Sequence, residues 1–241
     1  DASAEVARRF AAAQAGLTLH AADCRFDTAH AHVGHARRVL MDTAAARLEA
    51  AGPPGGGVIA STDGDSRVAP DWLAATLREI GAGADAVGGR LLADRDVEDD
   101  PSARRWQRWD LLHRLARERL ESLVDPDPAD PWPRHHQHFG ASLAVRARAY
   151  RAVGGLPRVR WLEDEALVAA LRCADRTVRH SPAVRVVTSS RREGRVDVGL
   201  SWQLREWDRL STQSPEMEVD DAAALLREAR ARAGLRRLWR S

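Results

Sequence analysis

Two carboxylates one residue apart, Asp63 and Asp65, are the residues whose type and spacing best suit chemistry in this chain. They follow a short apolar run, residues 58–60, that has the character of a β-strand. In open α/β sheets, ligands bind at the carboxyl ends of the strands. Mg²⁺ and Mn²⁺ prefer one or two carboxylates together with the oxygens of a substrate phosphate. The pattern therefore predicts a site where a divalent cation bridges the protein to a diphosphate.

Two structural alternatives compete with the metal-site interpretation. An EF-hand calcium loop is excluded, because Arg67, Val68 and Ala74 stand where that loop needs a third ligand, a glycine and a closing glutamate. A polar turn that leads into a helix near Asp71 stays open. Asp and Gly are frequent turn residues, and a lone Asp-x-Asp is a weak motif.

The composition indicates a globular protein. The chain has 241 residues, of which 30% are charged and 44% hydrophobic, and its net charge is +2. All 37 basic residues are arginines, and they are dispersed, which argues against a nucleic-acid partner. Two cysteines are too few for a disulfide framework or a cysteine-based zinc site, so we expect a reducing, cytoplasmic location. No apolar run reaches the roughly 18 residues of a membrane span.

Helical and strand-like segments alternate along the chain. We expect helices at residues 3–14, 33–50, 71–80, 101–124, 146–155 and 163–173, and strands at 17–22, 58–61, 84–93 and 142–145, followed by β-rich runs at 176–180 and 183–189. The alternation predicts an α/β fold with a mostly parallel sheet flanked by helices. Two amphipathic helices follow residue 199, so we expect a core over 1–199 and a helical extension over 200–241. Since the chain opens on a helix, we expect the first strand of the core to precede residue 1.

Three consecutive acids, Glu163, Asp164 and Glu165, begin one of the predicted helices. Acids are common at helix N-termini because the helix dipole favours negative charge there. A carboxylate fixed at such a position beside a cleft can also act as a general base toward a hydroxyl. Both interpretations stay open on the sequence alone.

Two basic segments are candidates for contacts with anions, and a histidine-rich segment is a candidate for a metal. Gly34 and Arg37 lie at the start of a predicted helix, where a phosphate can bind, although a solvated basic face explains them equally well. The loop at residues 189–195 contains Arg191 and Arg195 and is either solvated or in contact with an anion. Four residues, 135–138, read HHQH, but no cysteine or carboxylate stands at ligand spacing, so a dedicated zinc site is not favoured.

Taken in order, these segments resemble the family 2 glycosyltransferases, which have the GT-A fold of nucleotide-diphospho-sugar transferases. The similar segments, which are spread over residues 1–200, read DASAEVAR, VGHARRVLMDTA, STDGDSRVAPDWL, FGASLAVRARAYRAVGGLP, LEDEAL and SSRREGR. Each motif is short, but their shared order makes the resemblance specific. It implies a Rossmann-like GT-A core over residues 1–199 without the family's opening strand, which contacts the base and ribose of the donor.

The resemblance also implies roles for individual residues. Asp63 and Asp65 would hold Mn²⁺ or Mg²⁺ and the donor diphosphate, with Asp65 as the more direct ligand. Asp164 would be the catalytic base, and Glu163, beside it in the family's Glu-Asp motif, would be a second catalytic residue. Arg37 would lie near the donor, and Arg191 and Arg195 would contact it. The implied reaction moves a sugar from a nucleotide-sugar donor to a hydroxyl acceptor with inversion of configuration, since a base is in place and no nucleophile is evident.

Other functions stay open. A nucleotidyltransferase also uses carboxylates at strand ends, and a binding domain without catalysis would keep the same motifs. In a retaining relative His180 would be a metal ligand, although a histidine of the sheet is the simpler interpretation. The amphipathic helix at residues 220–240 could lie on an anionic membrane surface, but packing on its own domain is favoured.

Overall fold

The computed structural model describes residues 2–16, 18–52, 56–94, 101–194, 198–214 and 216–240. The chain divides into two compact units, Asp1–His32 and Val33–Ser241. In the first, helix α1 spans Ser3–Ala12 and buries none of its residues. The strand predicted at 17–22 is wrong, because residues 18–22 form neither helix nor strand. A strand needs a partner to pair with, and the described part of this unit contains no strand with which residues 18–22 could pair.

The second unit is built on a five-stranded sheet with the order β1-β4-β3-β5-β2. Its strands are β1 (Val58–Ser61), β2 (Ser66–Val68), β3 (Ala86–Ala93), β4 (Leu143–Arg146) and β5 (Val178–Thr188). Strand β3 runs parallel to β5, whereas β4 is antiparallel to both β1 and β3, and β2 is antiparallel to β5. Strands β1, β3 and β5 therefore point in the same direction.

The predicted α/β class is confirmed, but among the described strands the sheet is mixed, with one parallel pair. The reason is that β4, between β1 and β3, and β2, beside β5, run opposite to the other three strands. The apolar pattern of a buried strand does not depend on its direction. The sequence could therefore indicate that β4 is a strand without indicating how it pairs.

Strand β5 corrects a second expectation. The sequence predicts the β-rich runs at 176–180 and 183–189 as separate elements, but Val178–Thr188 is one continuous strand that passes through Pro182. Proline cannot donate a ladder hydrogen bond and is tolerated within sheets mainly at bulges and edges. The register between β3 and β5 shifts between Gly89 and Arg90, and this irregularity accommodates the proline.

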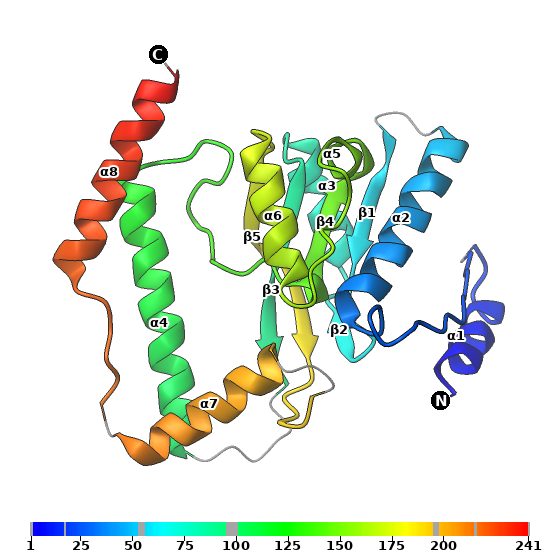
Figure 1. Cartoon of the computed structure of the whole chain (residues 1–241), viewed down its shortest axis with the longest axis horizontal. Helices are drawn as coiled ribbons and strands as arrows, with labels where there is room; N and C mark the ends of the chain where they lie inside the picture. Colours follow the sequence, from blue (N-terminus) through cyan, green and yellow to red (C-terminus); the bar gives the residue numbers. More distant parts are fainter. Residues whose placement is uncertain are drawn as a thin grey trace. The chain divides into compact units, whose positions relative to one another are not determined.

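Helices cover both faces of the sheet (Figure 1). The helices described in this unit are α2 (Val33–Ala51), α3 (Trp72–Gly81), α4 (Pro101–Val124), α5 (Ala147–Ala152), α6 (Glu163–Cys173), α7 (Leu200–Gln213) and α8 (Ala222–Arg240), and a 3-10 turn, η2, spans Gly140–Ser142. On one face, α2, α5 and α6 pack in a core with Leu143 and Val145 of β4. On the other face, α3 packs in a core with Ala144 of the same strand. This alternation of side chains along β4 buries both faces of the sheet.

The last two helices pack against α4. Helix α8 buries Ala229 and Ala233, and its Arg232 contacts Glu121 of α4 at 2.7 Å. Packing on its own domain is thus what the structure shows for this amphipathic helix. No helix in the described part of the chain is both long and apolar enough to cross a membrane. The division into a core over 1–199 and an extension over 200–241 stays a prediction.

Candidate active site

The sheet brings the predicted site residues to one edge. Because β1, β3 and β5 point in the same direction, their carboxyl ends meet at this edge, and the antiparallel strand β4 begins there. Asp63 follows β1, Gly140 precedes β4, and the loop that starts at Ser189 follows β5. Residues that lie far apart in the sequence are therefore neighbours at the edge.

Arg37 of α2 connects these segments. Its Nε donates to Oε1 of Glu163 at 2.9 Å, and its Nη2 donates to Oδ1 of Asp63 at 3.0 Å. Its Nη1 donates to Oγ of Ser61 at 2.7 Å and to the carbonyl oxygen of Gly140 at 2.8 Å. Burial disfavours the charged guanidinium, but Asp63 and Glu163 outweigh this effect and raise the pKa of Arg37. Arg37 is thus a fixed cation that holds the site together.

Gly140 permits this arrangement. A Cβ atom at residue 140 would overlap the guanidinium of Arg37, so the position accepts only glycine without a rearrangement. The backbone N–H of Gly140 donates to Oδ2 of Asp164 at 2.7 Å. The sequence showed a glycine entering a predicted strand here, but nothing in its local pattern indicated a contact with either residue.

The three acids at the start of α6 have different environments. Glu163 has a side chain that is only 5% exposed and is ion-paired with Arg37. Asp164 is partly exposed, and its two oxygens accept hydrogen bonds from the backbone N–H groups of Gly140 and Glu165. Among the described residues, Asp164 makes no ion pair, whereas Glu165 pairs with a histidine. The structure thus distinguishes three acids that the sequence could not.

A strained residue precedes these acids. Leu162, at the N-cap of α6, has φ 57° and ψ 41°, in the left-handed region that is unfavourable for a bulky side chain. Its side chain is half exposed, so packing in the core does not impose this conformation. The contacts of Glu163 with Arg37 and of Asp164 with Gly140 fix the turn from the other side. Such strain is often found at functional sites.

Asp65 lies in the same loop as Asp63 and pairs with Arg191, whose Nη2 is 2.8 Å from its Oδ2. The side chains of Asp63 and Asp65 are 41% and 34% exposed. The structure therefore brings Arg191 of the basic loop to the carboxylate pair. Arg195, the other arginine predicted to contact the donor, lies outside the described residues.

A buried chain of contacts, which sequence reasoning missed, begins at Glu165. Oε2 of Glu165 lies 2.8 Å from Nε2 of His138, and Nδ1 of His138 lies 3.0 Å from Nε2 of His180. Nδ1 of His180 lies 2.7 Å from Oδ2 of Asp130. Both ring nitrogens of His180 are therefore engaged by protein groups, which leaves neither for the metal of the retaining alternative. Asp130 comes from the loop between α4 and η2, where no local sequence pattern indicates its partner.

Of the other two histidines of the HHQH segment, His135 is buried and His136 is partly buried, and these environments disfavour the charged form of both rings. In His135, Nε2 lies 3.1 Å from the carbonyl oxygen of Ser181, and Nδ1 accepts from the backbone N–H of Gln137 at 3.1 Å. Burial lowers the pKa of His135 to about 3 and that of His136 to about 4. Among the described residues, no group of three or more His, Cys, Asp or Glu side chains is placed to hold a metal ion.

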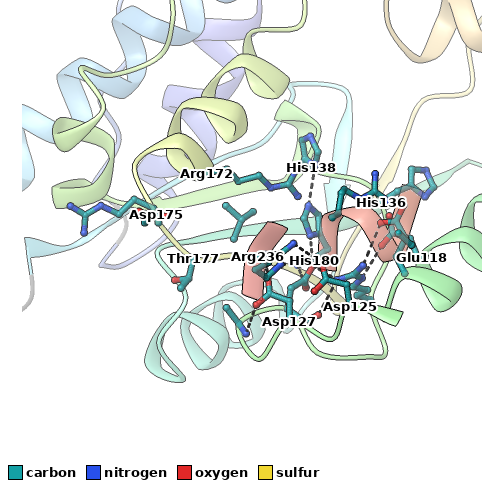
Figure 2. Close-up of a pocket in the computed structure, with 18 residues that line it drawn as sticks. Glu118, Asp125, Asp127, His136, His138, Arg172, Asp175, Thr177, His180 and Arg236 are labelled. Atoms are coloured by element: carbon teal, nitrogen blue, oxygen red, sulfur yellow. Dashed lines mark hydrogen bonds and ion pairs between the residues drawn. The ribbon is translucent and has the colours of Figure 1, made fainter. Parts of the chain in front are cut away.

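A cavity of about 590 Å³ borders this histidine chain (Figure 2). Its walls come from α4, α6, α8, the start of β5 and the loop between α4 and β4, and they include His136, His138 and His180. Figure 2 shows Arg172 extending toward His138 and His180. The cavity therefore reaches the histidine pair from the side opposite to the sheet edge that carries Asp63.

Comparisons of the chain with protein-family models, with curated proteins and with solved structures find no match.

Proposed function

We propose that the protein is a glycosyltransferase of the GT-A type that moves a sugar from a nucleotide-diphosphate sugar to a hydroxyl acceptor, with inversion of configuration. The observation that carries the proposal is the set of hydrogen bonds made by Arg37. They join Asp63 of the Asp-x-Asp segment to Glu163 of the Glu-Asp segment, residues that are 100 positions apart in the sequence. A transferase needs its donor-binding and base-carrying segments side by side.

The carboxylates suit a hard divalent cation by the chemistry of their donor atoms. Arg37 engages Oδ1 of Asp63, and Arg191 engages Oδ2 of Asp65, so each carboxylate has a second oxygen that these arginines do not bind. Two carboxylates leave most coordination positions for phosphate oxygens and water. When bound, Mn²⁺ or Mg²⁺ would neutralise the charge that develops on the departing diphosphate.

In this proposal the two arginines that bind the carboxylates, Arg191 and Arg37, have different roles when the donor is bound. When a cation and a diphosphate occupy the edge, Arg191 can exchange Asp65 for a phosphate oxygen, because both partners of this ion pair are substantially exposed. Arg37 is only 10% exposed and fixed by four contacts, so it stays in place. Its role is to orient Asp63 and Glu163, and a direct bond to the donor is not needed.

Asp164 is the candidate base. Glu163 is neutralised by Arg37, and Glu165 is paired with His138, which leaves Asp164 as the acid of this turn without a cationic partner in the described part of the chain. The backbone N–H groups that bind its oxygens orient the carboxylate without neutralising it. A partly exposed, oriented carboxylate is what proton transfer from a hydroxyl requires.

The reaction then follows in one displacement. The acceptor oxygen attacks the anomeric carbon as its proton passes to Asp164, and a new glycosidic bond forms. The bond from the anomeric carbon to the diphosphate oxygen breaks, and its electron pair leaves with the nucleoside diphosphate. Attack opposite to the leaving group inverts the configuration.

Calorimetry with UDP and GDP, each with and without Mn²⁺, tests the donor half of the proposal. We expect weak binding of the metal alone and tighter binding when nucleotide is present, because phosphate oxygens complete the coordination. Asp65→Ala should weaken metal-dependent nucleotide binding, whereas Asp71→Ala, which changes an exposed acid at the start of α3, should not. Equal affinities in Asp65→Ala and the unmodified protein would contradict the proposal.

A further inference from the structure

The histidine chain links the acids at the start of α6 to the protein interior. Glu165, at its outer end, is 47% exposed, while the side chains of His138, His180 and Asp130 are 8%, 4% and 7% exposed. Figure 2 shows the dashed line that joins the rings of His138 and His180. Four titratable groups in a row thus lead from the candidate site inward.

Asp130 fixes the inner end of this chain. Its Oδ1 accepts hydrogen bonds from the backbone N–H of His180 at 2.8 Å and from Nη1 of Arg179 at 2.9 Å. Burial alone would raise the pKa of Asp130, but the hydrogen bonds from His180 and Arg179 lower it to about 2. Asp130 is therefore an ionised acceptor, which places a proton on Nδ1 of His180.

The positions of the other ring protons follow from the donors and acceptors along the chain of contacts. When His180 is neutral with its proton on Nδ1, its Nε2 is an acceptor, so Nδ1 of His138 must donate to it. A neutral His138 would then present the lone pair of Nε2 to the carboxylate of Glu165 at 2.8 Å, and two acceptors repel each other. Three contacts need three protons, whereas two neutral rings supply only two.

The third proton lies on the imidazole rings of His138 and His180 and not on the carboxylate of Glu165. Nε2 of His138 lies 2.8 Å from Oε2 of Glu165, although the angles of this contact do not meet those of a hydrogen bond, and the contact is an ion pair when His138 is protonated. His138 lowers the pKa of Glu165, which keeps that carboxylate ionised. With both terminal carboxylates ionised, the extra proton lies on the imidazole pair. The pair then carries one positive charge between two negative groups.

We propose that His138 and His180 share one proton in addition to the two of the neutral rings, and that this positively charged pair lies between the carboxylates of Glu165 and Asp130. The charged pair positions the acid turn at the start of α6 for proton transfer. The inference rests on the proposed function as far as catalysis is concerned. The shared charge neutralises Glu165 as Arg37 neutralises Glu163. Asp164 therefore accepts a proton without a second unpaired carboxylate beside it.

The surroundings of the pair are mixed in charge. The titratable and charged groups that face the pair or share its cavity come from every element around it: Arg179 on β5, Asp125, Asp127, Asp130, Arg134, His135 and His136 in the loop between α4 and β4, Glu165 and Arg172 on α6, Asp175 and Arg176 in the turn after α6, Glu118 and Glu121 on α4, and Arg232 and Arg236 on α8. Arg134 and Arg236 are held by acids of the same wall. The two carboxylates in direct contact with the rings are therefore the strongest local influence on the shared proton.

The cavity gives the shared proton a route to solvent. Both His138 and His180 line it, and its volume of about 590 Å³ has room for many water molecules. The protonation of the buried pair can therefore follow the pH of the solution without an opening of the fold.

Nitrogen NMR of the histidine rings in the full chain tests the proton count. We expect His138 and His180 to lose one proton in a single shared step as the pH rises. Glu165→Gln removes one of the two carboxylates that hold this proton, so the step should move to lower pH. Because Glu165 is half exposed, this variant should fold even if Asp130→Asn does not.

His136→Gln is the matched control, because His136 lines the same cavity but, among the described contacts, makes no hydrogen bond to either ring of the pair. It should leave the shared step unchanged. Two rings that titrate independently, or a step that Glu165→Gln does not move, would overturn the inference.

Transfer kinetics separate this inference from the proposed function. If the unmodified protein transfers sugar, kcat/KM should fall at high pH as the histidine pair loses the extra proton, which is the alkaline limb of the pH profile. Glu165→Gln should shift this limb to lower pH in parallel with the NMR step. His138→Gln should abolish that limb and lower kcat/KM by up to about 100-fold through misplacement of the turn. If no transfer occurs, the proposed function fails while the NMR result still decides whether the proton is shared. An alkaline limb that His138→Gln leaves intact would refute the positioning role.

Discussion

The backbone N–H of Gly140 donates a hydrogen bond to Oδ2 of Asp164 at 2.7 Å, while the carbonyl oxygen of the same residue accepts one from Arg37 at 2.8 Å. One peptide segment thus joins the candidate base to the arginine that holds the carboxylate of Asp63. The base and the carboxylate pair cannot move independently while these bonds are intact. The geometry of the candidate site therefore depends on η2 and the residues that it contacts.

Arg37→Met should destabilise the protein by about 3 to 5 kcal/mol, because it leaves the carboxylate of Glu163 buried without a partner. Methionine keeps most of the side-chain volume, so the loss reports the charge and its hydrogen bonds. Denaturant unfolding gives the difference in free energy. Arg47→Met, on the exposed face of the same helix, should change stability by less than about 0.5 kcal/mol. Equal changes in the free energy of unfolding for the two variants would contradict the conclusion that Arg37 holds the site together.

Gly140→Ala should cost about 1 to 3 kcal/mol, since the added methyl group overlaps the guanidinium of Arg37 and forces it to move. The same displacement should weaken metal-dependent nucleotide binding through Asp63. Gly81→Ala is the control, because a Cβ at the end of α3 meets open space. Thermal unfolding and calorimetry together measure both effects, and a neutral Gly140→Ala would contradict the close approach of Arg37 to this glycine.

Asp164→Asn should lower turnover by about 10²- to 10⁴-fold while nucleotide and metal affinity stay nearly constant, because the amide keeps the size of the side chain and one of its two backbone hydrogen bonds but cannot take a proton. Asp65→Asn should instead weaken both binding and turnover. A transfer assay combined with calorimetry separates the two results. If Glu163→Gln or Glu165→Gln abolishes transfer while Asp164→Asn does not, another acid of the turn is the base.

The buried His135 should make the protein sensitive to acid. Burial lowers the pKa of His135 to about 3 in the folded state, whereas an unfolded histidine has a pKa of about 6.5. Its contribution to stability is therefore fully present above pH 6.5 and is lost as the pH falls from 6.5 toward 3, where only the unfolded chain binds the proton. The slope is about 1.4 kcal/mol per pH unit for one such group.

Denaturant unfolding between pH 7 and pH 4 measures this dependence. His135→Gln should reduce the slope by about one bound proton, because glutamine does not titrate. The prediction is wrong if the unmodified protein and His135→Gln have the same slope.

The sequence by itself determined the local elements and the types of residue at the site. The helices predicted at 101–124 and 163–173 agree with α4 and α6, because a sustained helical period and helix-favouring ends are encoded in neighbouring residues. The same holds for β1 and for the position of Asp63 and Asp65 just beyond it. Arg37 was a candidate for the site because it stands near the start of a helix.

The tertiary structure decided pairing and partners. Whether β4 runs parallel or antiparallel, and whether residues 18–22 find a partner strand, depends on backbone groups far away in the chain. Arg37 was expected near the donor, but its guanidinium is engaged by four protein groups contributed by three other segments. Hydrogen bonds and ion pairs between distant residues leave no periodic signal in the sequence.

The acids at the start of α6 show this limit most clearly. Sequence and helix dipole treat Glu163, Asp164 and Glu165 alike, since all three lie in the first turn. Only the fold gives one of them Arg37, one the peptide of Gly140 and one His138. Desolvation and charge pairing act over a few ångströms in space, so the roles of adjacent residues separate only when the chain has folded.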